Sequence, residues 1–176
     1  MSISKANLKK IGSTCLFVNG FIFLFYALFV PAFVHGVHWL ITLVAILFLL
    51  ALPAIYHSLH RVHGGAGKVV VALLGLAMVV IIASDLLFAL SILSGLSHEL
   101  AYALGNAVFI ICIFAIGAIA LKGRFLKWFG YLSILTGIIA LSTYVPQAPS
   151  LLPTISLLLL GFWSLAFGFN ITKLRK

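Results

Sequence analysis

Six long apolar stretches, separated by short basic clusters, constrain this chain more than any other feature of its sequence. Its eleven Lys and Arg residues fall into four clusters, and two apolar stretches lie between each cluster and the next. Apolar runs of about 18 residues or more predict helices that cross roughly 30 Å of hydrocarbon. The clusters are Lys5, Lys9 and Lys10; Arg61 and Lys68; Lys122, Arg124 and Lys127; and Lys173, Arg175 and Lys176.

The predicted fold class is all-α, a polytopic transmembrane bundle of six helices in a single domain over residues 1–176. The chain is 64% hydrophobic and only 7% charged, whereas soluble domains need about a quarter of their residues charged. No alternation of the kind that marks membrane β-strands is present. The expected spans are Ile11–Val34, Val37–Tyr56, Val69–Leu93, Leu100–Leu121, Trp128–Val145 and Leu151–Ile171.

The positions of the basic clusters predict the orientation of the bundle. Short loops rich in Lys and Arg stay in the cytoplasm. Each pair of spans between two basic clusters therefore crosses the membrane outward and back, and both termini are expected in the cytoplasm. A net charge of +9 would suggest nucleic acid in a soluble protein, but here the basic residues flank spans. We therefore expect no nucleic-acid binding, and anionic lipid headgroups as partners at the cytoplasmic face.

Asp85 is the only strongly charged residue within the six stretches. It follows Lys68 by 17 residues, which is about 25 Å along a helix, so no Lys or Arg reaches it. A buried carboxylate without a cation takes up a proton, collects neutral donors or binds an external cation. Because Asp85 lies in the outer half of its span, its possible basic partners are His35, His38 and His98. Asp85 is either a ligand or proton site or a polar tie between helices.

Other polar residues fall at the same predicted depth as Asp85. Asn106 and Asp85 are about equally far from the turn between the third and fourth spans, so the amide could donate to the carboxylate if the helices face each other. Tyr102 and Tyr144 also lie in the outer halves of their spans. Trp163, near the centre of its span, either packs internally or lines a cavity. These five residues form the predicted ligand or proton site.

Three His residues, His57, His60 and His63, are spaced so that two imidazoles could share a metal on one helix face. No Cys or acid completes a ligand set, and nearby basic residues repel a cation. A solvated interfacial patch is the simpler interpretation, and no metal or cofactor is expected. Glu99, at a helix N-terminus, interacts favourably with the helix dipole.

Small residues four apart predict close contacts between helices. Ala101 and Gly105, Ser133 and Gly137, and Ser164 and Gly168 have this spacing. Small side chains let helix backbones approach each other in the membrane.

The last two spans carry the sequences Lys122-Gly-Arg-Phe-Leu-Lys-Trp-Phe-Gly130 and Leu160-Gly-Phe-Trp-Ser-Leu-Ala-Phe-Gly168. A basic turn followed by Trp-Phe-Gly and a late Trp resembles the closing hairpin of uncharacterised small multi-pass bacterial membrane proteins. The resemblance implies a prokaryotic inner membrane and no catalytic residue.

Three functions remain open from the sequence. The favoured one is a ligand-binding or transport component with a polar site around Asp85 in the outer half, for a small or cationic ligand or a proton. The second is a structural or accessory subunit that packs against partner membrane subunits. The third is a membrane-embedded enzyme that uses His57, His60 or His63; since no nucleophile or metal set accompanies them, we expect a protein that is not an enzyme.

Overall fold

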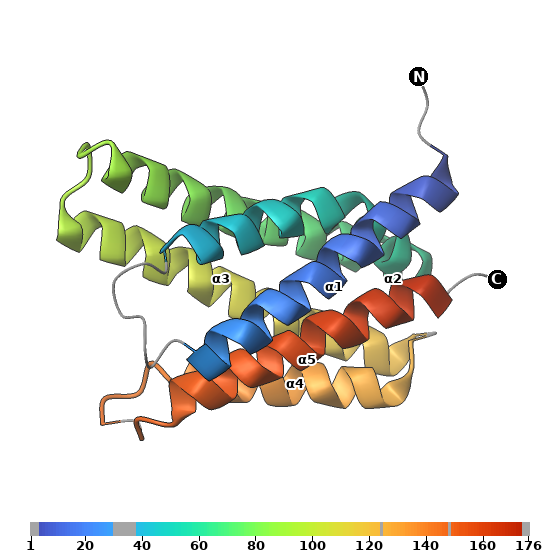
Figure 1. Cartoon of the computed structure of the whole chain (residues 1–176). Coiled ribbons are helices and arrows are strands. Elements are labelled where there is room, and N and C mark those ends of the chain that lie inside the picture. The colour runs from blue at the N-terminus through green and yellow to red at the C-terminus, as the bar shows by residue number, and fades with distance from the viewer. Residues whose placement is uncertain (1–3, 30–37, 124, 148, 174–176) are drawn as a thin grey trace.

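The computed structural model describes residues 4–29, 38–123, 125–147 and 149–173, and the regular structure in these ranges consists of helices joined by short turns. Figure 1 shows the helices lying side by side in a bundle. No strand is present in these ranges. The helices are α1 (Lys5–Phe29), α2 (His38–Ala89), α3 (Gly95–Lys122), α4 (Lys127–Ser142) and α5 (Leu152–Lys173).

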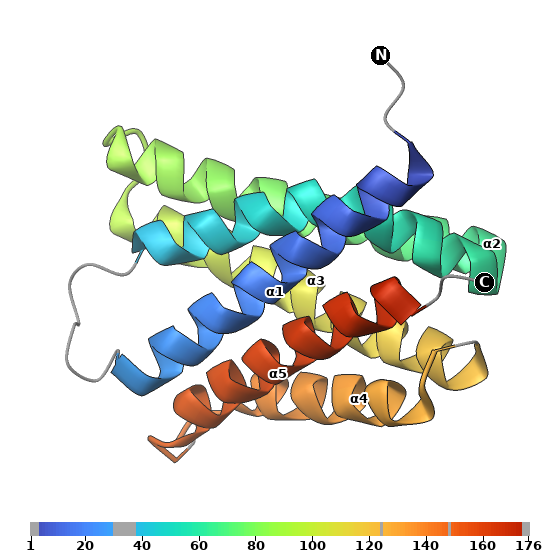
Figure 2. The ribbon, with the colours of Figure 1, turned by 45° about the vertical axis from the view of Figure 1, so that its right-hand side comes forward.

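The long helix α2 is a hairpin of two arms. A straight helix of 52 residues would extend for about 78 Å. Instead, Thr42 hydrogen-bonds to Asp85, and a Cβ atom at Gly75 would lie 3.1 Å from Leu52. These pairs are symmetric about residues 63 and 64, where the chain reverses (Figure 2). The two arms correspond to the second and third expected spans, Val37–Tyr56 and Val69–Leu93, with bounds of Leu40–His60 and Gly64–Ala89 in the structure.

The two arms of α2 and the other four helices form a closed ring of six rods. Each rod packs against the next along the chain, and α1 packs against α5 to close the ring. Successive rods are antiparallel, as Figures 1 and 2 show. The start of α1 therefore lies at the same end of the bundle as the end of α5, the turn of α2 and the connection from α3 to α4.

Five of the helical rods are long and apolar enough to cross a membrane. The exception lies in the fifth expected span, Trp128–Val145, where α4 has 16 residues and a length of about 24 Å. The six-span count is therefore not confirmed. α4 stops at Ser142, and the chain tightens into turns in which the N–H groups of Tyr144 and Val145 donate to carbonyls three residues back. Pro146 follows, and it disfavours the helical conformation for the residue before it.

Glycines bring two pairs of helices into backbone contact. A Cβ atom at Gly20 of α1 would lie 2.9 Å from the carbonyl oxygen of Gly161 on α5, and one at Gly161 would lie 3.1 Å from that of Gly20. Gly117 of α3 and Gly130 of α4 are related in the same way, at 3.1 Å in both directions. Close backbone approach replaces the hydrophobic effect as the source of packing where lipid surrounds the helices.

The predicted small-residue contacts also occur between helices. Gly105 faces Ala77 and Ile81 of α2, Gly137 faces Phe114 of α3, and Gly168 faces Ser13 of α1.

Candidate binding site: a central cavity beside Asp85

The turn between α2 and α3 places Asp85 opposite His98. α2 ends in a Schellman motif, in which the N–H of Ile92 donates to the carbonyl of Leu87 at 2.9 Å and Ser91 adopts a φ of 57°. Because this turn is tight, side chains a few residues before it and after it meet across the two helices.

Both oxygens of the Asp85 carboxylate have partners within the bundle. Nε2 of His98 lies 2.9 Å from Oδ1, and the hydroxyl of Thr42 donates to Oδ2 at 2.6 Å. Asp85 is 8% exposed and His98 6%. Of the three His residues considered from the sequence, the structure thus pairs His98 with Asp85; His35 and the side chain of His38 lie outside the described residues. The three residues tie together both arms of α2 and α3.

The imidazole of His98 connects this cluster with the interior of the ring. Its centroid lies 4.5 Å from that of Phe88, in a stacked arrangement, and 6.0 Å from that of Tyr102. Tyr102 lies one helical turn after His98 on α3, so its ring continues the row of side chains into the bundle.

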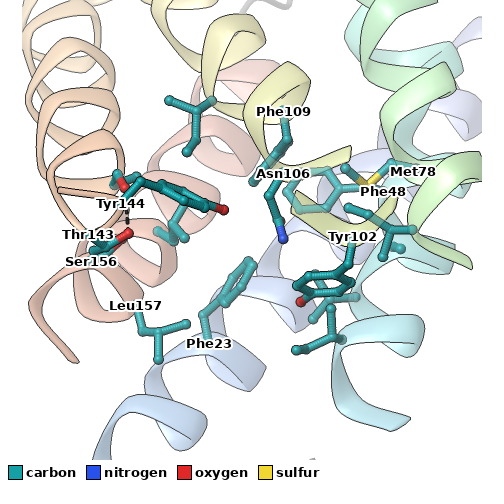
Figure 3. A pocket seen from close by; sticks show the side chains of 17 residues that line it. Phe23, Phe48, Met78, Tyr102, Asn106, Phe109, Thr143, Tyr144, Ser156 and Leu157 are labelled. Carbon is teal, nitrogen blue, oxygen red and sulfur yellow. Dashed lines mark hydrogen bonds between the residues drawn. The ribbon is translucent and has the colours of Figure 1, made fainter. Parts of the chain in front are cut away.

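A cavity of about 170 Å³ lies in the half of the bundle away from the basic end. Every rod of the ring contributes to its wall. Figure 3 shows the side chains of Tyr102, Asn106 and Tyr144 converging on this space among aromatic rings. The lining residues are Phe23, Ile41, Val44, Ala45, Phe48, Met78, Ile81, Tyr102, Asn106, Phe109, Ile110, Ala140, Thr143, Tyr144, Ser156, Leu157 and Leu160.

The structure thus brings together three of the five predicted site residues, Tyr102, Asn106 and Tyr144. Asp85 is not among the described lining residues. The residues of its cluster instead lie next to residues of the cavity wall. Thr42 follows the lining residue Ile41, and Asp85 lies one turn after Ile81. His98 lies one turn before Tyr102. A carboxylate in this position fixes the spacing of three wall segments rather than facing the cavity.

Trp163 packs internally, one of the two arrangements predicted for it. Its side chain is fully buried, and the indole Nε1–H donates to the hydroxyl of Ser133 on α4 at 2.8 Å. The ring lies 6.2 Å from Phe48 and 6.3 Å from Phe109, centroid to centroid. Because both Phe rings line the cavity, Trp163 lies directly behind its wall.

The histidine cluster lies at the opposite, basic end of the bundle. His60 is exposed; its Nδ1 lies 3.1 Å from the carbonyl of Gly64, and its ring stacks on Tyr56 at 5.3 Å. His57 is half-buried, and the side chain of His63 lies outside the described residues. Among the described side chains, no three His, Cys, Asp or Glu are grouped closely enough to hold a metal ion.

A groove of about 260 Å³ lies next to the cavity, at the end that carries the turn between α2 and α3. It shares Ile41 and Tyr102 with the cavity wall. Glu99, which is exposed, also lines the groove, together with Phe88, Gly95 and His98. Tyr102 therefore separates the central cavity from a surface recess.

Sequence reasoning missed the polar residues that complete the site. Thr42 of the Asp85 cluster and the lining residue Ser156 carry no signal of their own, because Ser and Thr are common in membrane helices, where their hydroxyls can bond to the preceding turn. Only their distance from the ends of their helices could have indicated them.

The chain matches no family model, and the searches found no curated protein and no solved structure with significant similarity to it. The apolar helices and their arrangement define its class: it is a helical integral membrane protein that crosses the bilayer several times.

Proposed function

We propose that this protein is a small-ligand binding or transport component of the membrane, with its site in the central cavity. The convergence of Tyr102, Asn106 and Tyr144 on one cavity is the observation that carries the proposal. Ligand pockets in proteins are mostly apolar, with a few polar groups that fix orientation. A bundle that served only as a scaffold gains nothing from such a cavity, because voids lose packing energy.

Asp85 acts in this proposal as a positioning residue. Its links to Thr42 and His98 hold both arms of α2 and α3 at a fixed distance, and that distance sets the width of the cavity. Because Thr42 and His98 bond to both oxygens of Asp85, the carboxylate needs no external cation. The sequence alone left such a cation as one of three possibilities.

The proposed setting is an inner membrane, with both chain ends in the cytoplasm and the cavity in the outer half. In support, all the Lys and Arg residues whose side chains the structure describes lie at one end of the bundle, namely Lys9, Lys10, Lys68, Lys122, Lys127 and Lys173. Anionic headgroups favour such an end by about 1 kcal/mol for each basic residue near the surface. The resemblance of the last two helices to small bacterial membrane proteins fits the same setting.

Substitution of Ala140 tests the proposal. Ala140 lines the cavity and is 4% exposed, so Ala140→Leu fills the cavity and leaves its polar groups in place. The matched control is Ala107→Leu, at an exposed position of α3. We expect a small-molecule library, screened by thermal shift in nanodiscs, to contain compounds that stabilise the parent and Ala107→Leu proteins but not Ala140→Leu. A library without any such compound would reject a binding function and favour the accessory-subunit hypothesis.

A further inference from the structure

The cavity wall contains no charged side chain among its described residues, which are all apolar, aromatic, hydroxyl or amide groups. Asp85, one helical turn after the lining residue Ile81, already has partners on both of its oxygens. An ion that leaves water for such a site loses several kcal/mol of hydration with no opposite charge to compensate for it. The chemistry of the wall therefore selects an uncharged occupant.

The size and lining of the cavity narrow the occupant further. A cavity of about 170 Å³ is close to the roughly 150 Å³ of an engineered protein cavity that binds benzene. Aromatic rings surround it on several sides, at Phe23, Phe48, Tyr102, Phe109 and Tyr144. Rings pack on rings in offset or edge-to-face contacts, which adds about 0.5–1.5 kcal/mol to simple burial.

The polar groups of the wall offer hydrogen bonds to an occupant. The amide of Asn106 supplies donors and an acceptor, and the hydroxyls of Tyr102 and Tyr144 supply both as well. Polar groups at an apolar site are costly when they are left without hydrogen bonds. A molecule with its own hydroxyl or N–H group can hydrogen-bond to them, and a pure hydrocarbon cannot.

We infer that the cavity binds an uncharged molecule of about one aromatic ring that carries a hydrogen-bonding group. This inference rests on the proposed binding function and names its ligand class. Phenol is the simplest probe of that class. Benzylammonium and benzoate test the role of charge at nearly the same size, and toluene tests the role of the hydroxyl.

Trp163 provides the readout because it lies behind two lining residues, Phe48 and Phe109. With Trp39→Phe and Trp128→Phe as the background, emission excited at the red edge of indole absorption reports Trp163 alone. We expect phenol, titrated into the protein in nanodiscs, to change this emission saturably. A Kd on the order of 0.1–1 mM is reasonable for so small a ligand.

Three variants separate site binding from partition into the lipid. Ala140→Leu abolishes the saturable signal, and Ala107→Leu retains it. Asn106→Leu weakens phenol binding about tenfold, which corresponds to about 1.4 kcal/mol, and leaves toluene binding unchanged. Circular dichroism and size-exclusion profiles of each variant show that it is folded.

The outcomes distinguish the ligand class from the binding function. Tighter binding of benzylammonium or benzoate than of phenol, sensitive to Ala140→Leu, would overturn the ligand class and leave the binding function in place. Equal binding of toluene and phenol would overturn the hydrogen-bonding requirement. If no probe gives a signal that Ala140→Leu removes, the ligand class is wrong, and the library screen described above decides on the binding function.

Discussion

Nε2 of His98 lies 2.9 Å from Oδ1 of Asp85, so a helix on each side of one tight turn contributes half of a buried polar pair. Each partner is less than one-tenth exposed. Asp85 is the only Asp, Glu, Lys or Arg within the six apolar stretches of the sequence, and the pair gives it a partner that is neither Lys nor Arg. Its loss should affect first the stability of the bundle and then the shape of the cavity beside it.

Substitution at either member of the pair should destabilise the protein. We expect Asp85→Asn to lower the free energy of unfolding by about 2 kcal/mol, because the amide has one acceptor oxygen in place of two and leaves a buried partner without its hydrogen bond, which costs about 1–3 kcal/mol. SDS-induced unfolding in mixed micelles measures this. In a double-mutant cycle with His98→Asn, the two effects should fall short of additivity by about 1 kcal/mol or more. The other acid, the exposed Glu99, provides the control: Glu99→Gln should change nothing measurable, and an equal loss there would show that the pair has no special role.

Ser133→Ala should leave the indole N–H of Trp163 without its partner in a fully buried position. The expected cost is about 1–3 kcal/mol of unfolding free energy, since an unsatisfied buried donor loses its full solvation. In the single-tryptophan background, the emission of Trp163 should also shift, because the hydroxyl dipole next to its nitrogen is gone. Ser142→Ala is the comparison, since that hydroxyl bonds only within its own helix. Unchanged emission in Ser133→Ala would contradict the contact.

The backbone contact between α1 and α5 should not tolerate a side chain. Gly161→Ala places a methyl group 3.1 Å from the carbonyl of Gly20 and 2.7 Å from Leu24, so the helices must move apart. We expect a loss of about 1–3 kcal/mol, as for other overpacked positions. Gly65→Ala, where a methyl group would meet no atom within 4 Å, should instead stabilise its helix slightly, because alanine favours helix over glycine by about 1 kcal/mol. Similar effects at both positions would rule out a close contact at Gly161.

The orientation of the bundle is open to direct labelling. In a background with Cys15→Ser and Cys112→Ala, we expect Ser97→Cys to react with a membrane-impermeant maleimide from outside intact cells. Lys68→Cys should react only after the membrane is permeabilised, because basic segments stay on the cytoplasmic side. The reverse pattern would overturn the proposed orientation and place the cavity in the inner half.

The sequence by itself determined the class of fold. Long apolar stretches cannot remain in water, and buried backbone groups in lipid must be satisfied within a helix, so length and composition alone predict membrane helices. The alternation of basic and apolar segments determined the order of the hairpins and the gathering of basic residues at one end. The apolar pattern did not distinguish the short α4 from a full span. The helix ends at Ser142, but the apolar run continues from Trp128 to Val145, just before Pro146.

The tertiary structure alone decided how the helices are rotated. A lipid-facing side chain is as apolar as a buried one, so periodicity does not reveal which face of a membrane helix points inward. The sequence also predicts one depth for Asn106 and Asp85, and this prediction is wrong, because the turn lies closer to Asp85 along the chain than to Asn106. His98 lies opposite Asp85, whereas Gly105, next to Asn106, faces Ala77 and Ile81, one to two helical turns away from Asp85. The rotation of α3 turns Asn106 toward the cavity and His98 toward Asp85. Contacts of α3 with both of its neighbours accompany that rotation: Gly105 packs on Ala77 and Ile81 of α2, and Gly117 packs on Gly130 of α4.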